Sequence, residues 1–445
     1  MLVESDTIYA LATAHGRAGI AVFRLSGPSA GEALRQIAKL DVLPDPRRTI
    51  RCRMVDPATG DPLDDGLAIW FPSPASLTGE DVVELHIHGG RATTDAVAAA
   101  LSSLGGLRLA EPGEFSKRAF LAGKIDLTGA EAVADLVDAE TEAQRRQALA
   151  QLGGGLAGRL EAWRAQLIDV LAHIEAWIDF PDEDLPDGVA RSAREKIGGL
   201  RAEMGEFLAD NRRGERLRDG LQIAILGAPN AGKSSLLNAL ARRDVAIVSD
   251  TAGTTRDVIE VHLDLGGWPV TLADTAGLRE AGDEIEQEGV RRALDRSEVA
   301  DLRLVVFDGS TTPDITSLGL LENKDTIAVA NKSDLPGSAA NFSDGIDTLT
   351  VSAKTGDGLA GLLTRIEAAA ATFFDHGGQA PLTRARHREA LVACVASLER
   401  AVAAKKSELV AEDLRMAARA LGRVTGRVDV EDLLDVIFAD FCIGK

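Results

Sequence analysis

The pattern of apolar and polar positions divides the chain into stretches of different secondary structure. Between residues 1 and 120, short apolar runs alternate with glycine- and proline-rich turns, which predicts a mixed α/β region. Its clearest strands are predicted at 20–25, 66–71 and 82–88. From about residue 125, apolar residues recur at three- and four-residue spacing, the period of a helix. One such stripe comprises Leu156, Leu160, Trp163, Leu167, Val170, Ile174 and Trp177.

A second change of pattern begins at residue 221. Apolar runs alternate with helical stretches there, as in a parallel sheet covered by helices, and these runs lie at 221–227, 270–275, 303–310, 326–334 and 349–354. Helical periodicity resumes from about residue 380 and ends in a stretch with Val430, Leu433, Leu434, Ile437, Phe438 and Phe441. Because helical stretches flank the α/β pattern, we expect one helical domain interrupted by an insertion. The arginine-rich segment 211–220 is expected to be a solvated hinge, and a nucleic-acid-binding patch is the rival interpretation.

Composition narrows the class of protein. A chain of 445 residues with 45% hydrophobic and 27% charged residues is expected to form two or three soluble domains. No apolar run approaches the roughly 18 residues of a membrane span, and Cys52, Cys394 and Cys442 form no paired motif, so we expect a cytoplasmic protein without a membrane. The net charge is −20, whereas a protein that mainly binds phosphate backbones is normally basic. If nucleic acid is bound, a local patch or a partner must supply much of the attraction.

The stretch GAPNAGKS at 227–234 follows an apolar run and precedes a helical one, which is the context of a phosphate-binding loop. In such a loop, backbone N–H groups surround the phosphates, Lys233 reaches the terminal phosphates and the Ser234 hydroxyl ligates Mg²⁺. Thr255 is placed to supply a second hydroxyl to Mg²⁺, and Asp274 fits the carboxylate that acts through water.

Two later motifs indicate that the nucleotide base is guanine. In NKSD at 331–334, the Asp334 carboxylate can accept from N1–H and the 2-amino group together. The backbone of SAK at 352–354 can meet the guanine O6. The order and spacing of these motifs predict a GTP site comprising Asn230, Ala231, Gly232, Lys233, Ser234, Ser235, Ser249, Asp250, Thr251, Ala252, Gly253, Thr254, Thr255, Asp274, Thr275, Ala276, Gly277, Asn331, Lys332, Asp334, Ser352, Ala353 and Lys354.

The residue after DTAG is Leu278, where many GTPases carry a glutamine that orients the attacking water. Another group must therefore place the water and neutralise the developing charge. Asn230 and the small, polar loop 249–254 could surround a monovalent cation at the position of an arginine finger. Glu286, acting through a bridging water, is the catalytic candidate. The alternative is that the acidic run around Glu286 only solvates a helix.

Read together, the phosphate-binding loop, GTTRD, DTAGLRE, NKSD and the terminal FCIGK resemble the MnmE (TrmE) family of tRNA modification GTPases, within the TrmE-Era-EngA-Septin-like superfamily. The N-terminal motifs DTIYALAT, GRAGIAVFRLSG, LTGEDVVELHIHGG and PGEFSKRAFLAGKIDL extend the resemblance over nearly the whole chain. It implies a multidomain fold: an α/β folate-binding and dimerisation domain at 1–122, an all-α helical-bundle domain at 123–217 and 376–445, and an inserted α/β P-loop G domain at 218–375.

The resemblance also implies function. Members are K⁺-activated homodimeric GTPases that form a heterotetramer with the flavoprotein MnmG (GidA). Together they install a carboxymethylaminomethyl or aminomethyl group at C5 of the wobble uridine of certain tRNAs, using a reduced folate of the 5-formyl- or methylene-tetrahydrofolate type. The implied site residues are Asn230, Ser249, Thr251 and Thr254 for K⁺, Ser234 and Thr255 for Mg²⁺, Glu286 for the water, and Arg24, Glu84, Lys124 and Lys445 for folate.

The residues support the folate site independently. In 82–88 a period of two puts Val83, Leu85 and Ile87 on one face of a strand and Glu84, His86 and His88 on the other. Glu84 can then read the N–H and amino pair of a pterin, and the rival interpretation is a zinc site at the two histidines. Cys442 shares a tail with Lys445, and its role, as nucleophile, orienting group or structural residue, stays open. The alternative for the whole chain is a regulatory GTP switch in ribosome assembly without modification chemistry.

Overall fold

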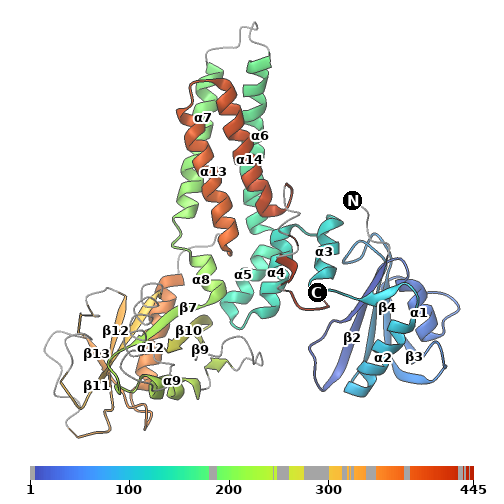
Figure 1. Cartoon of the computed structure of the whole chain (residues 1–445), viewed down its shortest axis with the longest axis horizontal. Helices are drawn as coiled ribbons and strands as arrows, with labels where there is room; N and C mark the ends of the chain where they lie inside the picture. The colour runs from blue at the N-terminus through green and yellow to red at the C-terminus, as the bar shows by residue number, and fades with distance from the viewer. Residues whose placement is uncertain are drawn as a thin grey trace, which may run out of the picture. The chain divides into compact units, whose positions relative to one another are not determined.

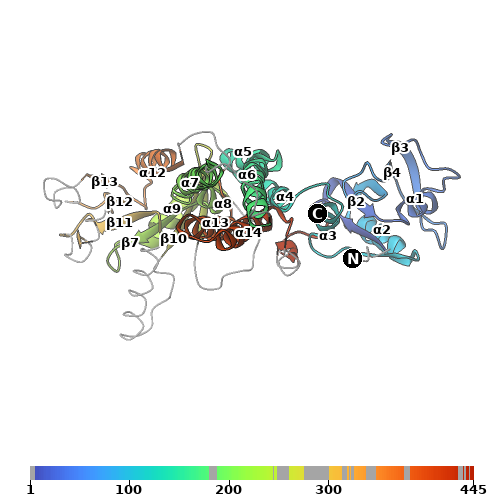
Figure 2. The same ribbon diagram turned by 90° about the horizontal axis from the view of Figure 1, so that it is seen from above.

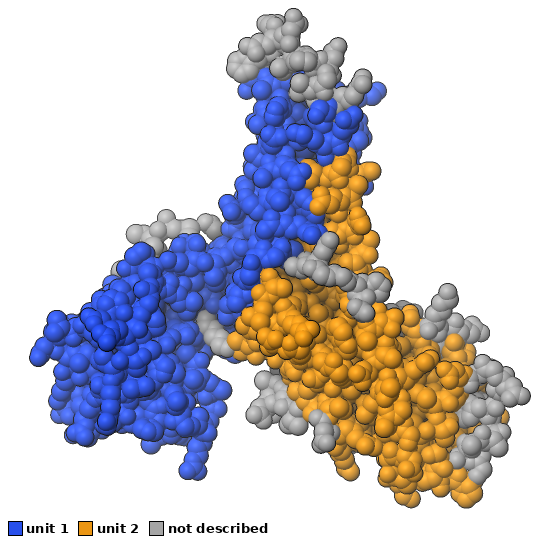
Figure 3. Space-filling model, turned by 180° about the vertical axis from the view of Figure 1, so that it is seen from behind, with its two compact units in different colours: residues 1–134, 152–197, 396–445 blue, residues 135–151, 198–395 orange. Residues whose placement is uncertain are grey.

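The structure is a computed structural model, and it describes residues 6–179, 188–243, 245–247, 260–274, 300–312, 318–319, 321, 325–336, 347–374, 381–428, 434, 437–439 and 441–444. The chain forms two compact units, coloured separately in Figure 3. Unit 1 comprises residues 1–134, 152–197 and 396–445, and unit 2 comprises 135–151 and 198–395. None of the described helices combines the length and apolar composition that a membrane span needs. The three domain boundaries expected from the sequence, after residues 122, 217 and 375, stay a prediction.

The N-terminal part of unit 1 is built on a six-stranded sheet of order β3-β4-β5-β2-β1-β6 (Figure 1). The strands are β1 Thr7–Leu11, β2 Ala18–Ser26, β3 Ile50–Val55, β4 Pro62–Phe71, β5 Val82–Gly89 and β6 Leu107–Leu109. Helices α1 (Ala30–Ala38) and α2 (Arg91–Ser103) pack on the sheet and share its buried core. The predicted strands at 20–25, 66–71 and 82–88 are confirmed as parts of β2, β4 and β5.

The alternation predicted for β5 is also confirmed. Val83, Leu85 and Ile87 are buried in the core, whereas Glu84 and His86 are partly exposed on the other face. The period of two works here because α1 and α2 cover one face of the sheet, whereas the other face is covered only in part, where Phe115 packs on β1. Glu84 is therefore available to a ligand.

The helical part of unit 1 contains α3 (Glu114–Leu121), the first part of α4 (Leu127–Asp138), α6 (Gly155–Asp179) and α14 (Ser407–Thr425). α6 lies alongside α14 in both views (Figure 1 and Figure 2). The predicted apolar stripe of α6 is buried from Leu156 to Ile174, but Trp177 is 41% exposed, so its assignment to the stripe is wrong. Farther along the chain, Phe438 and Phe441 pack with Leu127 of α4 in a separate small core.

Unit 2 contains a seven-stranded sheet of order β13-β12-β11-β7-β10-β9-β8. Its strands are β7 Leu221–Leu226, β8 Ala246–Ile247, β9 Glu260–Leu265, β10 Trp268–Asp274, β11 Leu302–Asp308, β12 Thr326–Asn331 and β13 Thr348–Thr350. The five predicted strands are confirmed and pair in parallel. The antiparallel β8 and β9 were missed, although Gly266 and Gly267, both with positive φ, mark the β9–β10 hairpin.

The helices of unit 2 are α5 (Glu142–Leu152), α8 (Arg213–Asp219), α9 (Lys233–Ala241), α12 (Leu359–Phe374), and parts of α7 (Gly188–Leu208) and α13 (Ala385–Ala403). α9 and α12 pack against strands β9 and β10 and contribute Leu236, Leu240, Leu362 and Ile366 to the core of the sheet. This core fixes the positions of the parallel strands relative to one another. The loops predicted to bind the nucleotide follow the carboxyl ends of these strands.

The expectation of a solvated hinge at 211–220 is wrong. Residues Arg213–Asp219 form α8, in which Gly214 and Glu215 are buried. Glu215 pairs with Arg388 of α13 at 2.8 Å, and Arg216 pairs with the buried Asp301 before β11 at 2.6 Å. Of the arginines that suggested a hinge, Arg216 and Arg218 therefore have partners about 80 positions away, which the local pattern does not show.

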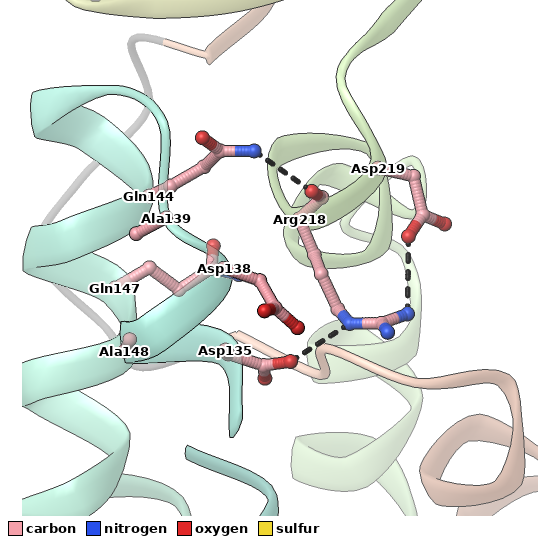
Figure 4. A pocket seen from close by; sticks show the side chains of 8 residues that line it. All are labelled: Asp135, Asp138, Ala139, Gln144, Gln147, Ala148, Arg218 and Asp219. Carbon is pink, nitrogen blue, oxygen red and sulfur yellow. Dashed lines mark hydrogen bonds and ion pairs between the residues drawn. The ribbon is translucent and has the colours of Figure 1, made fainter. Parts of the chain in front are cut away.

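The other side of α8 borders a polar pocket lined by α4, α5 and α8 (Figure 4). Arg218 lies between Asp135 and Asp219, at 2.9 Å and 3.0 Å, and Gln144 donates to the Arg218 carbonyl. α8 is thus bonded on several sides within unit 2.

Candidate nucleotide and folate sites

The predicted phosphate-binding loop connects β7 to α9. A Cβ on Gly227 would lie 2.1 Å from the Val306 carbonyl oxygen, and one on Gly232 would lie 2.3 Å from Asn331 Nδ2, so both positions require glycine. Asn230 and Gly232 have positive φ values of 62° and 93°, a backbone form that turns successive N–H groups toward one concavity. The loop therefore has the conformation of an anion-binding site at a helix N-terminus.

Lys233 is the first residue of α9, and its ammonium group is folded back over the loop. Its Nζ donates to the carbonyl oxygens of Gly227 and Ala228 at 2.8 Å and 2.9 Å. These carbonyls hold the charge within the loop, where phosphate oxygens are stronger acceptors for it. Ser234 follows and is exposed at the helix start, which is the position from which a hydroxyl can ligate Mg²⁺.

Asn331, predicted as part of the NKSD motif, connects two loops. Its side chain is buried, its Nδ2 donates to the Ala231 carbonyl at 3.0 Å, and its Oδ1 accepts from the Ala353 N–H at 3.0 Å. One amide thus joins the phosphate-binding loop to the SAK loop. Asn331 thus has a structural role here, and the second N–H of its Nδ2 leaves its predicted part in binding GTP a prediction.

Asp334 is oriented by its neighbours. The Ser352 hydroxyl donates to Asp334 Oδ1 at 2.7 Å and itself accepts from the Thr355 N–H at 3.1 Å. The Ser333 N–H also donates to the Val351 carbonyl at 3.1 Å, which ties the two base-side loops together. A carboxylate held in this way can accept the paired N–H groups of guanine without first losing rotational freedom.

Sequence reasoning missed Asp308 at the end of β11. The ammonium of Lys332, whose φ is 66°, pairs with Asp308 Oδ2 at 2.6 Å. Burial tends to raise the pKa of Asp308, but hydrogen bonds from Lys332 and Ser310 lower it below its ordinary value overall. The pair holds the aliphatic stem of Lys332 in place beside the base-reading loop. A carboxylate directly after an apolar run, in VVFDGS, was the available signal.

Several predicted residues lie outside the described residues. Asp274 ends β10, and its backbone pairs with Ile225 of β7, so it lies at the same sheet edge as the phosphate-binding loop. The structure describes no side-chain position for Asp274. Also outside are Ser249, Asp250, Thr251, Ala252, Gly253, Thr254, Thr255, Thr275, Ala276, Gly277, Leu278, Glu286 and Lys445.

Two of the predicted folate residues form an ion pair in unit 1. Arg24 of β2 and Glu84 of β5 are opposite each other in the antiparallel register. Both Nε and Nη2 of Arg24 donate to Glu84 Oε1, at 3.1 Å and 3.0 Å, and the two side chains are 23% and 20% exposed. Both charges thus remain partly accessible, although the Arg24 guanidinium also lies over the Phe115 ring, 5.9 Å from its centroid.

The C-terminal tail reaches this pair. Arg24 Nη1 lies 3.5 Å from the Gly444 carbonyl oxygen, Ile443 bridges to Pro112, and the Gly113 N–H donates to the Cys442 carbonyl at 3.4 Å. Cys442 is exposed, so its thiol is accessible beside the predicted site. The structure therefore brings the sequence-distant Arg24, Glu84 and residues 442–444 together, and the folate site itself stays a prediction.

Lys124 has a different neighbourhood. Its Nζ donates to the Pro74 carbonyl, and its side chain lies against Gly79. The Lys124 side chain therefore contacts the loop that precedes β5. A direct contact with Glu84 is not among its described interactions. A role for Lys124 in binding folate stays a prediction.

The rival zinc site receives no support from the described residues. His88 Nδ1 pairs with Asp64 at 2.9 Å, and the His88 N–H also donates to Asp64. His86 faces Glu84 instead. Within the described ranges, no group of three or more His, Cys, Asp or Glu side chains is arranged to hold a metal ion.

The parallel sheet, the phosphate-binding loop and the guanine-side loops define a multidomain P-loop GTPase. Two family models match the chain: "GTP-binding protein TrmE N-terminus" over residues 7–124, and "MnmE helical domain" over 127–442. The chain belongs to the MnmE family of tRNA modification GTPases.

Curated relatives agree over the full length. The chain is similar to the tRNA modification GTPase MnmE of Paramagnetospirillum magneticum, with 59% identity over 99% of this chain and 100% of the relative. The tRNA modification GTPase MnmE of Parvibaculum lavamentivorans is 58% identical, with the same shares covered. Among solved structures, the G domain of the T. maritima FeoB iron transporter is 28% identical over 34% of this chain and 98% of that chain, with a TM-score of 0.26.

Proposed function

We propose that this tRNA modification GTPase hydrolyses GTP to GDP and phosphate in a K⁺-dependent reaction, and that hydrolysis drives modification of the wobble uridine of certain tRNAs. The modification adds a carboxymethylaminomethyl or aminomethyl group at C5, and a folate supplies the one-carbon unit. The observation that supports this proposal best is that one chain contains two features. The loops expected to bind a guanine nucleotide are joined to one another, and the Arg24–Glu84 pair lies beside the C-terminal tail. A regulatory switch in ribosome assembly does not require this second site.

The roles proposed in unit 2 follow from chemistry. Lys233 and the loop N–H groups bind the phosphates, and Asp334 selects guanine. Ser234 and Thr255 hold Mg²⁺, with Asp274 acting through water, whereas Asn230, Ser249, Thr251 and Thr254 hold K⁺. When bound, these cations supply positive charge where negative charge develops on the transferred phosphoryl group. Glu286 orients the attacking water through a second water, in place of the glutamine that Leu278 replaces.

The roles proposed in unit 1 concern a reduced folate of the 5-formyl- or methylene-tetrahydrofolate type. The Glu84 carboxylate accepts from the pterin N–H and amino group, Arg24 holds that carboxylate, and Lys445 and Lys124 are the remaining proposed contacts. The residues fit the ligand, since Glu84 is accessible and Oε1 is already fixed by Arg24. A bound folate supplies a carbon atom at the oxidation level of formaldehyde or formate.

The proposed partners are a second copy of the chain, the flavoprotein MnmG (GidA) in a heterotetramer, and the tRNA. With a net charge of −20, the chain by itself attracts phosphate backbones poorly. A partner that contributes positive surface would then provide much of the tRNA affinity. The flavin of that partner would supply redox chemistry to the complex.

Nucleoside analysis of tRNA tests the proposal. Deletion of the gene should remove the modified wobble uridine, the intact gene should restore it, and a gene encoding Glu84→Ala should not. In parallel, isothermal titration should show that a reduced folate binds the wild type and binds Glu84→Ala more weakly by about 2–3 kcal/mol. If the deletion strain keeps the normal amount of the modified nucleoside, or if no folate binds, the regulatory switch would be favoured instead.

The cation requirement has its own test. GTP turnover should rise steeply when K⁺ replaces Na⁺, because the site formed by Asn230 and the loop 249–254 should suit the larger ion. Asn230→Ala should lose the K⁺ response while nucleotide binding changes little. Equal turnover in the two salts would contradict K⁺ activation and leave the GTP site intact.

A further inference from the structure

His86 of β5 has a ring nitrogen without a hydrogen-bond partner. Its Nε2 lies 3.5 Å from Glu84 Oε2, beyond a good hydrogen bond, and it is buried with no hydrogen-bond partner among the described residues. A buried polar atom left unpaired in this way costs about 1–3 kcal/mol. The side chain is 28% exposed on this face of the sheet, but Nε2 itself is covered, so a ligand beside Glu84 reaches this nitrogen only after a small shift of the ring.

The two oxygens of the Glu84 carboxylate, beside His86, have different partners. Glu84 Oε1 accepts both bonds from Arg24, whereas Oε2 is the oxygen that faces His86. The strand register explains this order, because Arg24 is opposite Glu84 and Val22 is opposite His86. Arg24, Glu84 and His86 therefore present a guanidinium, a carboxylate and an imidazole side by side on one sheet face.

The tautomer of His86 follows from this neighbour. A lone pair on Nε2 would point at the negative Oε2 only 3.5 Å away, whereas an N–H is attracted to it. Nε2 therefore carries the proton and is a donor that lacks an acceptor of good geometry. A ligand bound to Glu84 with a carbonyl oxygen on the Oε2 side would supply that acceptor.

A natural folate has this arrangement of groups. The edge of its pyrimidinone ring presents the oxygen at C4, the N3–H and the 2-amino group, in that order: one acceptor followed by two donors. Glu84 can accept from both donors, with N3–H on Oε2 and the amino group on Oε1, which leaves the C4 oxygen next to His86. We propose that His86 Nε2–H donates to this oxygen and makes the site selective for 4-oxo over 4-amino pteridines.

This selectivity rests on the proposed folate function and gives it a defined chemistry. A 4-amino group would bring a second donor against Nε2–H, lose the hydrogen bond and leave both groups unpaired. Sites that hydrogen-bond a substrate group reject analogues without that group strongly, because their own polar atoms then stay unsatisfied. His86 thus adds to the specificity that Glu84 already gives through the N3–H, which a 4-amino ring lacks, and Glu84 provides most of the attraction.

Isothermal titration of the full chain with folic acid and aminopterin tests this assignment, because the two ligands differ in the 4-oxo or 4-amino group and in the N3 hydrogen that goes with the oxo form, and only the first difference faces His86. Titration with 5-formyltetrahydrofolate in parallel shows whether a reduced folate binds. His86→Leu should weaken the binding of folic acid about tenfold, or about 1.4 kcal/mol, and should change the affinity for aminopterin little. The preference for the 4-oxo ligand should therefore fall about tenfold. His86→Gln, which retains an N–H donor, should recover most of that preference.

His88→Leu is the matched control, since His88 lies two residues farther along β5 and pairs with Asp64. It should leave both affinities unchanged. Equal losses for the two ligands in His86→Leu would mean that His86 only supports the strand, and an unchanged preference would remove it from the site; either result overturns the assignment. A wild type that binds none of these folates overturns the proposed folate function, and this assignment with it.

Discussion

Asn331 and Ser352 illustrate how single side chains organise the nucleotide site without contacting the phosphates. Asn331 joins the phosphate-binding loop to the SAK loop, and Ser352 donates to the carboxylate that is proposed to read guanine. The usual description of NKSD as a base-reading motif therefore divides into two parts in this chain. Asn331 and Ser352 set the geometry, and Asp334 is the residue proposed to contact guanine.

Ser352→Ala should weaken GTP binding by about 1 kcal/mol, roughly a fivefold change in affinity, because Asp334 loses the hydrogen bond that fixes its rotamer. Equilibrium titration with a fluorescent GTP analogue measures this change. Thr364→Ala, an exposed hydroxyl on α12 that bonds only within its own helix, is the control and should have no effect. An unaltered affinity in Ser352→Ala would show that Asp334 needs no support.

Glu286→Ala should lower GTP turnover by about two to three orders of magnitude, or roughly 3–4 kcal/mol of barrier, because the proposed bridging water would lose its holder. GTP affinity should hardly change, since a group that acts in the transition state contributes little to ground-state binding. Single-turnover hydrolysis in saturating K⁺ measures the first quantity and nucleotide titration the second. Leu278→Gln should not restore the rate, and wild-type turnover in Glu286→Ala would leave the acidic run with a solvating role.

α8 shows how a short helix can connect elements from distant parts of the chain. Its Glu215 is buried and pairs with Arg212 and Arg388, and its Arg216 reaches Asp301 before β11. Burial tends to raise the pKa of Glu215, but hydrogen bonds from Arg212 and Arg388 lower it below its ordinary value overall. The ionised carboxylate is therefore the form that stabilises unit 2.

Glu215→Gln should lower the free energy of unfolding of unit 2 by about 3 kcal/mol at neutral pH, because two arginines lose their carboxylate. The native pKa of Glu215 is depressed, so its contribution is present above the unfolded value of about 4.3 and is lost as the pH falls through the native pKa. Urea unfolding between about pH 7 and pH 3 should therefore show the wild-type and variant curves converging in acid.

The matched control for this prediction is Glu142→Gln. Hydrogen bonds from Arg145 and Arg146 lower the pKa of Glu142 to about 2, but these three side chains are solvent-exposed on α5. Solvent screening makes such pairs weak, so this variant should differ little from the wild type at any pH. Parallel pH curves for wild type and Glu215→Gln would contradict a stabilising role for the buried carboxylate.

The two ligand sites belong to different compact units. The described GTP residues are all in unit 2, whereas Arg24, Glu84 and the C-terminal tail are in unit 1. The tail is separated from Arg24 by about 420 positions in the chain and still contacts it. Binding of the two ligands is therefore expected to respond separately to local changes.

Deletion of residues 442–445 should weaken folate binding at least about tenfold, or about 1.4 kcal/mol, because Arg24 loses its contact with the Gly444 carbonyl and the tail no longer borders the pair. GTP affinity should stay unchanged. Isothermal titration with each ligand measures both. Cys442→Ala keeps the backbone carbonyl that Gly113 contacts, so it should bind folate like the wild type. Loss of folate binding in that control would assign the contribution to the thiol.

The local pattern of residues was sufficient to predict the core strands and the chemical groups that each loop carries. Alternating burial in β5 and the buried stripe of α6 follow directly from side-chain period, because one covered face imposes a repeat of two or 3.6 residues. The phosphate-binding loop was equally predictable, since one continuous segment supplies its glycines, its lysine and its hydroxyl. The same reasoning failed for Trp177, which continues the period of α6 beyond the part that is covered.

The neighbours of each loop were decided by packing between segments that are distant in the chain. Asn331 meets Ala231, Asp308 meets Lys332, Glu215 meets Arg388 and Arg24 meets Gly444 only in the folded chain. A charge pattern such as that of 211–220 is compatible with a solvated segment or a buried helix, because the cost of burying a charge depends on partners that lie elsewhere. Local sequence therefore specified which groups can do chemistry, and tertiary contacts determined which of them are held, paired or left available to a ligand.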